Sequence, residues 1–231
     1  MQTKAIKTRI FVGREDLFSF ILKYVRKIPE QSIIVVTSKI VALSEGRFVE
    51  YKGKKQRSEL IKKESDFILE KNFLFTIKDG MVMAFAGVDE SNGDGRLTFL
   101  PEDCYRSAEV LRKKIMRKFG LKKLGVLITD SGFIPLRSGA VGMAIGYAGF
   151  KGIRNYIGSK DIFGRVLKMS KTNVADSLAT SAVLCMGEGK EKTPLAIITN
   201  APVIFKNKIN KKELVINPRK DMYAPLFNKI N

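Results

Sequence analysis

Two apolar segments of this chain run directly into polar side chains that carry oxygen. Residues 81–85, Met-Val-Met-Ala-Phe, lead within a few positions to Asp89, and residues 124–129, Leu-Gly-Val-Leu-Ile-Thr, lead to Asp130. Such runs favour buried strands, and α/β-type proteins place ligand groups at the carboxyl ends of their strands. Because Mg²⁺ binds between carboxylates and substrate phosphates, the pattern predicts an edge where a divalent cation and phosphate oxygens meet.

A third acidic residue, Glu188, follows an expected helix in the sequence Met-Gly-Glu. Convergence of Asp89, Asp130 and Glu188 is what two divalent ions on a triphosphate require, although a single Asp at a strand end is usually only a turn or cap residue. Residues 187–191, Gly-Glu-Gly-Lys-Glu, lack the first glycine spacing and the Ser/Thr of a Walker A loop. A nucleotide bound here would therefore need another cradle.

The chain contains no histidine. This excludes Ser-His-Asp and Cys-His nucleophile pairs and any His-ligated zinc. Cys104 and Cys185 are the only cysteines, too few for a disulfide scaffold, and we expect both to be reduced, buried residues. Catalysis would depend on carboxylates, lysines, arginines, hydroxyls, backbone amides and metal ions.

The formal net charge is +19, from 42 basic and 23 acidic residues. Such an excess favours anionic partners. The lysines occur in short groups over many elements, which predicts a generally cationic surface more than a nucleic-acid stripe; a nucleic-acid-binding protein with steep salt dependence is the alternative. No apolar run approaches a membrane span and the N-terminus lacks a signal-peptide core, so we expect a cytoplasmic protein with no membrane partner.

A length of 231 residues suits one large domain or two small ones. The periodicity predicts alternating strands and helices without a repeat or linker, so two domains would be interleaved. Between residues 138 and 158 the glycines are compatible with close backbone contacts, tight turns or a phosphate cradle. The expected strands are 5–11, 32–37, 73–77, 81–86, 124–129 and 195–199, and the expected helices are 16–25, 40–44, 57–70, 101–119 and 174–186.

Short blocks of this sequence resemble those of the coenzyme F-420 γ-glutamyl ligases and occur in the same order as in that family. The resemblance covers about residues 5–200, and the Gly-Val-Asp-Glu-Ser-Asn block is its most specific part. The blocks are Val-Val-Thr-Ser-Lys-Ile-Val (35–41), Ala-Gly-Val-Asp-Glu-Ser-Asn (86–92), Leu-Pro-Glu-Asp (100–103), Ile-Thr-Asp-Ser (128–131), Gly-Met-Ala-Ile-Gly (142–146), Asp-Ile-Phe-Gly-Arg (161–165), Val-Ala-Asp (174–176) and Met-Gly-Glu (186–188).

The resemblance implies an enzyme that joins the α-amine of L-glutamate to a carboxylate of a deazaflavin acceptor, driven by hydrolysis of GTP to GDP. It implies two Mg²⁺ or Mn²⁺ ions and an α+β fold of two interleaved subdomains with mixed sheets, assembled as an intertwined homodimer. Residues 1–204 would form the ligase-like domain, and residues 205–231 a basic C-terminal extension.

Matched by motif, the resemblance implies that Asp89, Asp130 and Glu188 are metal ligands. Ser131 stands where the family usually has a threonine ligand, and its hydroxyl would serve equally.

The same matching implies nucleotide contacts from Ser38, Lys39 and Asn92. A carboxylate is a poor electrophile, so amide formation needs it activated, as in an acyl phosphate. Phosphoryl transfer needs positioning and charge neutralisation more than covalent catalysis, and Lys39, Arg137 and Arg165 can supply that charge. Taken without the resemblance, these cations would be interpreted as surface salt-bridge residues.

Two positions depart from the family pattern. Ile134 replaces an arginine that follows the Asp130 motif, and Leu43 stands where a second lysine is usual. The segments Pro-Leu-Arg (135–137) and Gly-Tyr-Ala-Gly-Phe (146–150) resemble a bacterial branch for which folate is the expected acceptor. Deazaflavin or folate, GTP or ATP, the number and linkage of the glutamates, and an inactive nucleotide-binding protein all stay open.

Overall fold

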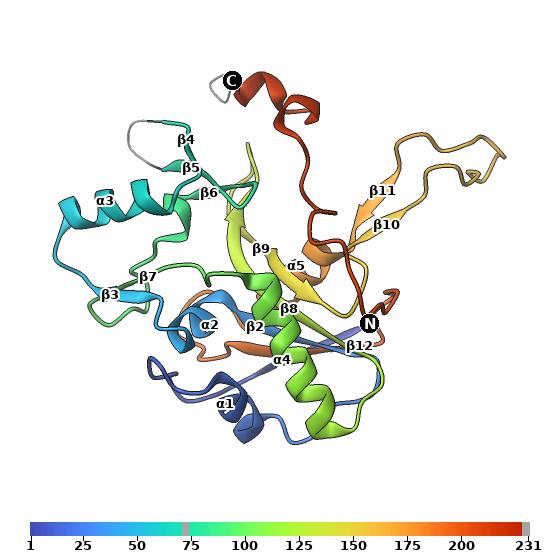
Figure 1. Cartoon of the computed structure of the whole chain (residues 1–231). Coiled ribbons are helices and arrows are strands. Elements are labelled where there is room, and N and C mark those ends of the chain that lie inside the picture. The colour runs from blue at the N-terminus through green and yellow to red at the C-terminus, as the bar shows by residue number, and fades with distance from the viewer. Residues whose placement is uncertain (71–73, 228–231) are drawn as a thin grey trace.

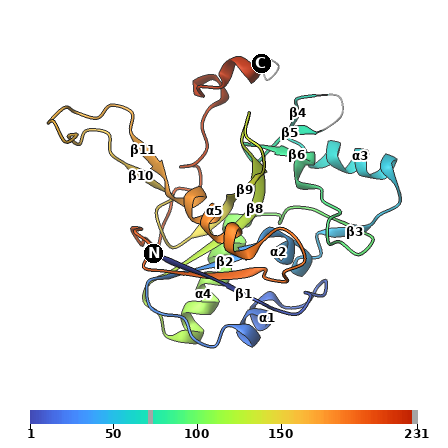
Figure 2. The ribbon, with the colours of Figure 1, turned by 180° about the vertical axis from the view of Figure 1, so that it is seen from behind.

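A five-stranded sheet forms the centre of the molecule, with helices on both faces (Figures 1 and 2). The computed structural model describes residues 1–70 and 74–227. The strand order is β1-β12-β2-β8-β9; β2 and β8 are parallel and the other neighbours are antiparallel. The strands are β1 (Gln2–Ile6), β2 (Ser32–Thr37), β8 (Leu124–Phe133), β9 (Ala140–Ala148) and β12 (Leu195–Thr199).

The alternating side chains of β2 divide the core into two layers. Ile34 and Val36 lie in the cluster that contains α1 (Leu17–Tyr24) and α4 (Cys104–Phe119). Ile33 and Val35 lie in the cluster formed with α5 (Val174–Met186) on the other face. Because both faces are covered, residues 33–36 of the strand are all apolar instead of alternating with polar residues. The short helix α2 (Ser38–Ser44) follows β2 directly.

The helices that flank the sheet begin at side-chain caps. Asp103 accepts a hydrogen bond from the Arg106 amide at 2.8 Å at the start of α4, and Gly120, with φ 68°, ends that helix. Asn173 accepts a hydrogen bond from the Asp176 amide at 3.0 Å at the start of α5. These two predicted helices are confirmed.

Residues 48–98 form a second group between α2 and α4, to one side of the main sheet (Figure 1). Ile61, Val88 and Leu97 of this group form a small core together with Phe99, the residue that follows it. Its elements are β3 (Phe48–Glu50), α3 (Lys54–Glu64), β4 (Phe67–Ile68), β5 (Phe75–Lys78), β6 (Met81–Ala84), the 3-10 turn η1 (Phe85–Gly87) and β7 (Arg96–Thr98).

Two further segments leave or return to the body. The strands β10 (Ile153–Asn155) and β11 (Lys171–Asn173) carry a long hairpin, residues 156–170, that projects from the molecule in both views (Figures 1 and 2). We call this hairpin the arm. Residues 200–227, which we call the C-terminal segment, pack back on the body and then form η2 (Pro218–Lys220) and η3 (Ala224–Phe227). Residues 228–231 of the predicted extension lie outside the described residues.

An α+β fold with mixed sheets is confirmed, whereas interleaved subdomains, the boundary at residue 204 and the homodimer stay predictions. Several expected boundaries are wrong. β1 ends at Ile6, α3 covers Lys54–Glu64, and β8 continues to Phe133 because residues 130–133 keep pairing with β9. Phe73, the expected start of one strand, lies outside the described residues. Cys104 is buried as expected, but Cys185 is exposed.

Glycines in β9 serve close packing against helices on both faces. A Cβ at Gly142 would stand 2.4 Å from the carbonyl oxygen of Ala179 in α5, and one at Gly146 would stand 2.5 Å from Cys104 in α4. Of the alternatives left open by the sequence, close backbone approach is the one found at these two positions. None of the helices in the described residues has both the length and the apolar character to cross a bilayer.

Candidate active site

The ammonium group of Lys39 is bound to Asp89 and to Ser91, two residues further along the chain. Lys39 is the second residue of α2, immediately after the buried strand β2. Its Nζ lies 2.6 Å from Asp89 Oδ2, and it donates to the carbonyl oxygen of Ser91 at 2.5 Å and to Ser91 Oγ at 3.0 Å. One cation therefore joins the main sheet to the group formed by residues 48–98.

Asp89 reaches this position through a tight turn, whereas the sequence predicts it directly at the end of a strand. β6 belongs to the three-stranded sheet β4-β5-β6 and ends at Ala84, and η1 follows with φ 51° at Ala86 and 72° at Gly87. A Cβ on Gly87 would lie 2.5 Å from Leu100 Cγ, so both the backbone angle and the space favour glycine. The sequence pattern could not show this reversal because the apolar run continues through it.

Asp89 is also held by the chain that follows. Its Oδ1 accepts the Ser91 amide at 2.8 Å and its Oδ2 accepts the Ser91 hydroxyl at 2.7 Å. Its backbone exchanges two hydrogen bonds with Thr98 of β7, at 3.0 and 2.8 Å. This Asp-turn geometry fixes the carboxylate before any ligand binds.

The other three predicted ligands lie together: Asp130 and Ser131 are on β8, and Glu188 is beside the strand. Ser131 Oγ donates to Glu188 Oε1 at 2.6 Å, and the Ser131 amide donates to Asp130 Oδ1 at 2.9 Å. Gly187, with φ 78°, turns the chain at the end of α5 and brings Glu188 beside the strand. Contrary to the prediction, Asp130 lies inside β8 and not at its end.

The three carboxylates interact electrostatically. Burial raises the pKa of Asp130 to about 6, and the negative charges of Asp89 and Glu188 add to this shift against the opposing effects of the Ser131 amide and Lys39. For Asp89, burial favours the neutral form, but the Lys39 ammonium and Ser91 outweigh it and lower the pKa. Negative charge thus accumulates around Asp130 and is partly compensated by Lys39.

The carboxylates are neighbours but do not form a closed ligand set. Across residues 1–70 and 74–227, no three Asp, Glu, Cys or His side chains stand close enough to share one metal ion. Asp89 is engaged by Lys39, and Glu188 by Ser131. The candidate ligand atoms are all carboxylate or hydroxyl oxygens, which suit Mg²⁺ or Mn²⁺ better than a metal that prefers thiolate ligands.

The predicted nucleotide contacts flank this cluster. Ser38 is buried at the first position of α2, and Asn92 follows Ser91 as an exposed residue with φ 50°. Leu43, the departure from the family pattern, packs against the main core, and Ile134 is exposed in the β8–β9 turn.

Arg137 and Arg165 are not brought into the cluster. Arg137 is exposed in the turn between β8 and β9, and Arg165 is exposed in the arm, where its amide donates to Asp161 Oδ1 at 2.9 Å. Among the described residues, neither guanidinium has a hydrogen bond or ion pair with the three carboxylates. Their catalytic role stays a prediction.

Two residues of the site were not identified from sequence. Ser91 holds both Asp89 and Lys39, and its position two residues after an aspartate is the pattern that could have indicated it. Thr129 is 1% exposed, and its hydroxyl has no hydrogen-bond partner among the described residues. A buried hydroxyl beside Asp130 costs free energy unless a ligand or water satisfies it.

A sequence model of one ligase family, described as F420-0:Gamma-glutamyl ligase, matches residues 5–200. The matched region includes Lys39 and all three carboxylates. The chain therefore belongs to the F420-0:gamma-glutamyl ligase family, as the sequence blocks had indicated.

Individual relatives are similar over 80% to 96% of this chain. A protein of Methanococcus maripaludis strain C6, named coenzyme F420:L-glutamate ligase, is 36% identical over 96% of this chain and 97% of its own length. Proteins of the same name from Methanocaldococcus jannaschii and Archaeoglobus fulgidus are 37% identical over 92% of both chains, and 35% identical over 80% of this chain and 81% of theirs.

Proposed function

We propose that this protein is a nucleotide- and divalent-metal-dependent ligase that adds L-glutamate, through an amide bond, to a carboxylate of a small anionic acceptor. The observation that carries the proposal is that the Lys39–Asp89 pair and the Ser131–Glu188 pair both lie within electrostatic reach of Asp130. Membership of the ligase family and the names of the relatives give the reaction class.

In this proposal the cluster residues would hold two Mg²⁺ or Mn²⁺ ions. Burial first, and then the charges of Asp89 and Glu188, raise the pKa of Asp130, and a dication beside this carboxylate would stabilise its charged form. The ions, when bound, would neutralise the phosphate charges of GTP or ATP.

In this proposal Lys39 pairs with Asp89 when no metal ions are bound and with nucleotide phosphates when they are. Without other cations, its ammonium balances the charge of Asp89. When ions take over that balance, the flexible side chain is free to turn toward nucleotide phosphate oxygens, with which Lys makes strong point-charge contacts. Ser38 and Asn92, on either side of the pair, are the proposed further nucleotide contacts.

The proposed reaction has two balanced steps. The acceptor carboxylate attacks the terminal phosphorus of the nucleotide, forming an acyl phosphate and releasing the nucleoside diphosphate. The amine of L-glutamate then attacks the acyl carbon, loses a proton and expels inorganic phosphate. Neither step requires a histidine, since charge neutralisation and orientation dominate phosphoryl transfer.

We further propose that the working unit is a homodimer. The arm exposes large apolar side chains, including Ile162 at 92%, Phe163 at 83% and Met169 at 87% exposure. Exposed apolar groups of this kind mark association surfaces. A second copy that receives the arm would bury them and bring Arg165 near a carboxylate cluster.

The activity is tested by incubating the protein with L-glutamate, GTP or ATP, Mn²⁺ and acceptors of the deazaflavin and folate types. We expect one acceptor to gain a glutamyl unit by mass spectrometry, with one nucleoside diphosphate formed per bond. Asp130→Asn should reduce turnover by at least about a hundredfold, the usual scale for loss of charge stabilisation. No glutamyl gain and no nucleotide hydrolysis on any of these acceptors would contradict the proposal.

A further inference from the structure

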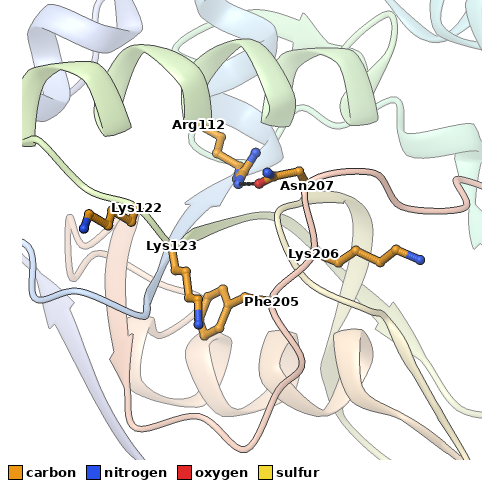
Figure 3. A pocket seen from close by; sticks show the side chains of 6 residues that line it. All are labelled: Arg112, Lys122, Lys123, Phe205, Lys206 and Asn207. Carbon is orange, nitrogen blue, oxygen red and sulfur yellow. Dashed lines mark hydrogen bonds between the residues drawn. The ribbon is translucent and has the colours of Figure 1, made fainter.

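Cationic side chains surround a hollow that belongs to neither the carboxylate cluster nor the arm. It has a volume of about 170 Å³ and is open to solvent. This exceeds the roughly 10–15 Å³ that holds one water molecule, so a tetrahedral anion fits. Figure 3 shows its lining from α4, the α4–β8 loop and the C-terminal segment: Arg112, Lys122, Lys123, Phe205, Lys206 and Asn207.

Arg112 is the fixed part of this hollow. It is 4% exposed although it projects from the amphipathic helix α4. Its Nε donates to the Leu124 carbonyl at 2.7 Å, its Nη2 donates to Asn207 Oδ1 at 2.7 Å, and its Nη1 lies 3.5 Å from Glu109 Oε2. A guanidinium has five N–H donors, so within the described chain two of them have no recorded acceptor.

The local charge balance favours an anion. Four cations line the hollow, and two carboxylates lie beside it. Glu109 lies 3.5 Å from Arg112 Nη1 and also pairs with the Lys113 ammonium at 3.3 Å, on the exposed side of α4. Glu30 accepts the backbone amides of Lys122 and Lys123, whose ammonium groups form no ion pair among the described residues. The lysine side chains are therefore available to a ligand.

The hollow is far from the proposed catalytic cluster. Lys123 immediately precedes β8, and Asp130 lies within that strand, seven residues further along the chain. At about 3.3 Å per residue, the strand separates them by roughly 20 Å. An anion in the hollow cannot contact the carboxylates, so this site is not the nucleotide phosphate site of the proposed reaction.

We propose that the hollow binds the phosphate group of a small ligand, with Arg112 as a preorganised donor. The flexible side chains of Lys123 and Lys206 would turn toward the bound anion; the Lys206 ammonium points away from Arg112 in the structure (Figure 3). Arg and Lys are the residues that recognise phosphate through charge-assisted hydrogen bonds. Phe205 supplies an apolar wall beside these cations (Figure 3), which suits a phosphate ester with a ring attached. Inorganic phosphate shares the same anionic chemistry.

The proposal is tested by ³¹P NMR titration of the full chain with inorganic phosphate and with phenyl phosphate, in EDTA at constant ionic strength. We expect saturable binding of at least one. Tighter binding of phenyl phosphate would identify an ester as the source, and equal binding would identify free phosphate. No saturation with either would overturn the site.

A charge-matched pair of variants locates the binding. Lys123→Ala with Lys206→Ala should weaken binding by at least about tenfold, the value of one charged hydrogen bond. Lys168→Ala with Lys208→Ala removes the same charge from exposed positions outside the hollow and should leave binding unchanged. Equal losses in both pairs would show only general attraction to a cationic surface and would overturn the proposal. Asp130→Ala should retain binding; its loss there would place the phosphate at the other cluster and overturn it equally.

Discussion

At the scale of single residues, Lys39 decides the state of the site. Its ammonium satisfies Asp89 and two oxygens of Ser91. A contact this well made keeps the carboxylates from repelling one another, and it also means that a divalent ion must displace a lysine to reach Asp89.

We therefore predict that Lys39→Ala binds Mn²⁺ more tightly in the absence of nucleotide, by about 1 kcal/mol or more, since it removes a competing charge a few ångströms from the ligands. The same variant should lose nucleotide turnover. Electron paramagnetic resonance of free Mn²⁺ measures the affinity, with Lys168→Ala in the arm as a control. Weaker Mn²⁺ binding in Lys39→Ala would show that the lysine supports the ions and does not compete with them.

Asp130 carries a stability cost that depends on pH. Its pKa is raised from 3.8 to about 6, so the folded state holds a proton that the unfolded state releases. The cost is absent below pH 3.8 and grows as pH rises through about 6, reaching roughly 1–3 kcal/mol at pH 7. We predict that Asp130→Asn increases the free energy of unfolding by this amount at pH 7 in EDTA, and by little at pH 3.8.

Urea unfolding at the two pH values measures this difference. An Asp130→Asn variant that is destabilised at pH 7 would mean that the charged carboxylate is favoured where it stands, contrary to its burial beside Asp89 and Glu188.

Sequence reasoning named most residues of the cluster but not their geometry. Asp89 and Glu188 were found because short polar blocks interrupt apolar runs, and the family resemblance joined them to Lys39. Two features depend on packing between distant segments: the positive-φ turn at Ala86 and the ion pair between Lys39 and Asp89. Hydrophobic periodicity carries no information about such packing.

At the scale of elements, β2 and β8 are the rigid supports of the site. Their residues are almost entirely buried and paired in parallel, and each leads to a functional group at the same edge, Lys39 after β2 and Asp130 on β8. Their apolar runs made both strands predictable. The extension of β8 to Phe133 was not, because Ser131 and Gly132 are poor strand formers that tertiary pairing with β9 overrides.

The C-terminal segment is an element of the body. Glu213 accepts the Tyr147 hydroxyl at 2.5 Å and the Gly152 amide at 2.7 Å, and Tyr147 is fully buried. Burial raises the pKa of Tyr147, and its hydrogen bond to Glu213 raises it further, so the hydroxyl remains a donor at neutral pH.

We predict that Glu213→Ala lowers the free energy of unfolding by about 1–3 kcal/mol, because it leaves a buried hydroxyl unpaired. Lys212→Ala, its exposed neighbour, should change it by less than about 0.5 kcal/mol. Chemical denaturation measures both. Equal stability of the two variants would mean that the tail is only loosely attached.

At the scale of the whole molecule, the arm is the feature that a single copy leaves unexplained. It holds the Asp161–Arg165 block of the family away from the body and exposes apolar side chains. Its sequence matched the family, but a one-chain pattern does not reveal which surface covers it.

We predict a homodimer in which Arg165 serves the partner's site. Light scattering should give twice the mass of the 25.9 kDa chain. Inactive Arg165→Ala and Asp130→Ala chains, unfolded and refolded together, should recover about a quarter of wild-type activity, since half of the dimers then contain one intact site. A monomer, or no recovery on mixing, would place Arg165 outside the partner's site.

We propose that Asp89, Asp130, Ser131 and Glu188 bind divalent ions against a nucleotide to drive glutamate ligation. The most direct measurement is a crystal structure of the protein soaked with Mn²⁺ and a non-hydrolysable GTP or ATP analogue, with anomalous scattering to locate manganese. We expect manganese bound to these four side chains, with Lys39 moved from Asp89 to a phosphate oxygen. Manganese bound elsewhere, with the Lys39–Asp89 pair intact beside the nucleotide, would contradict it.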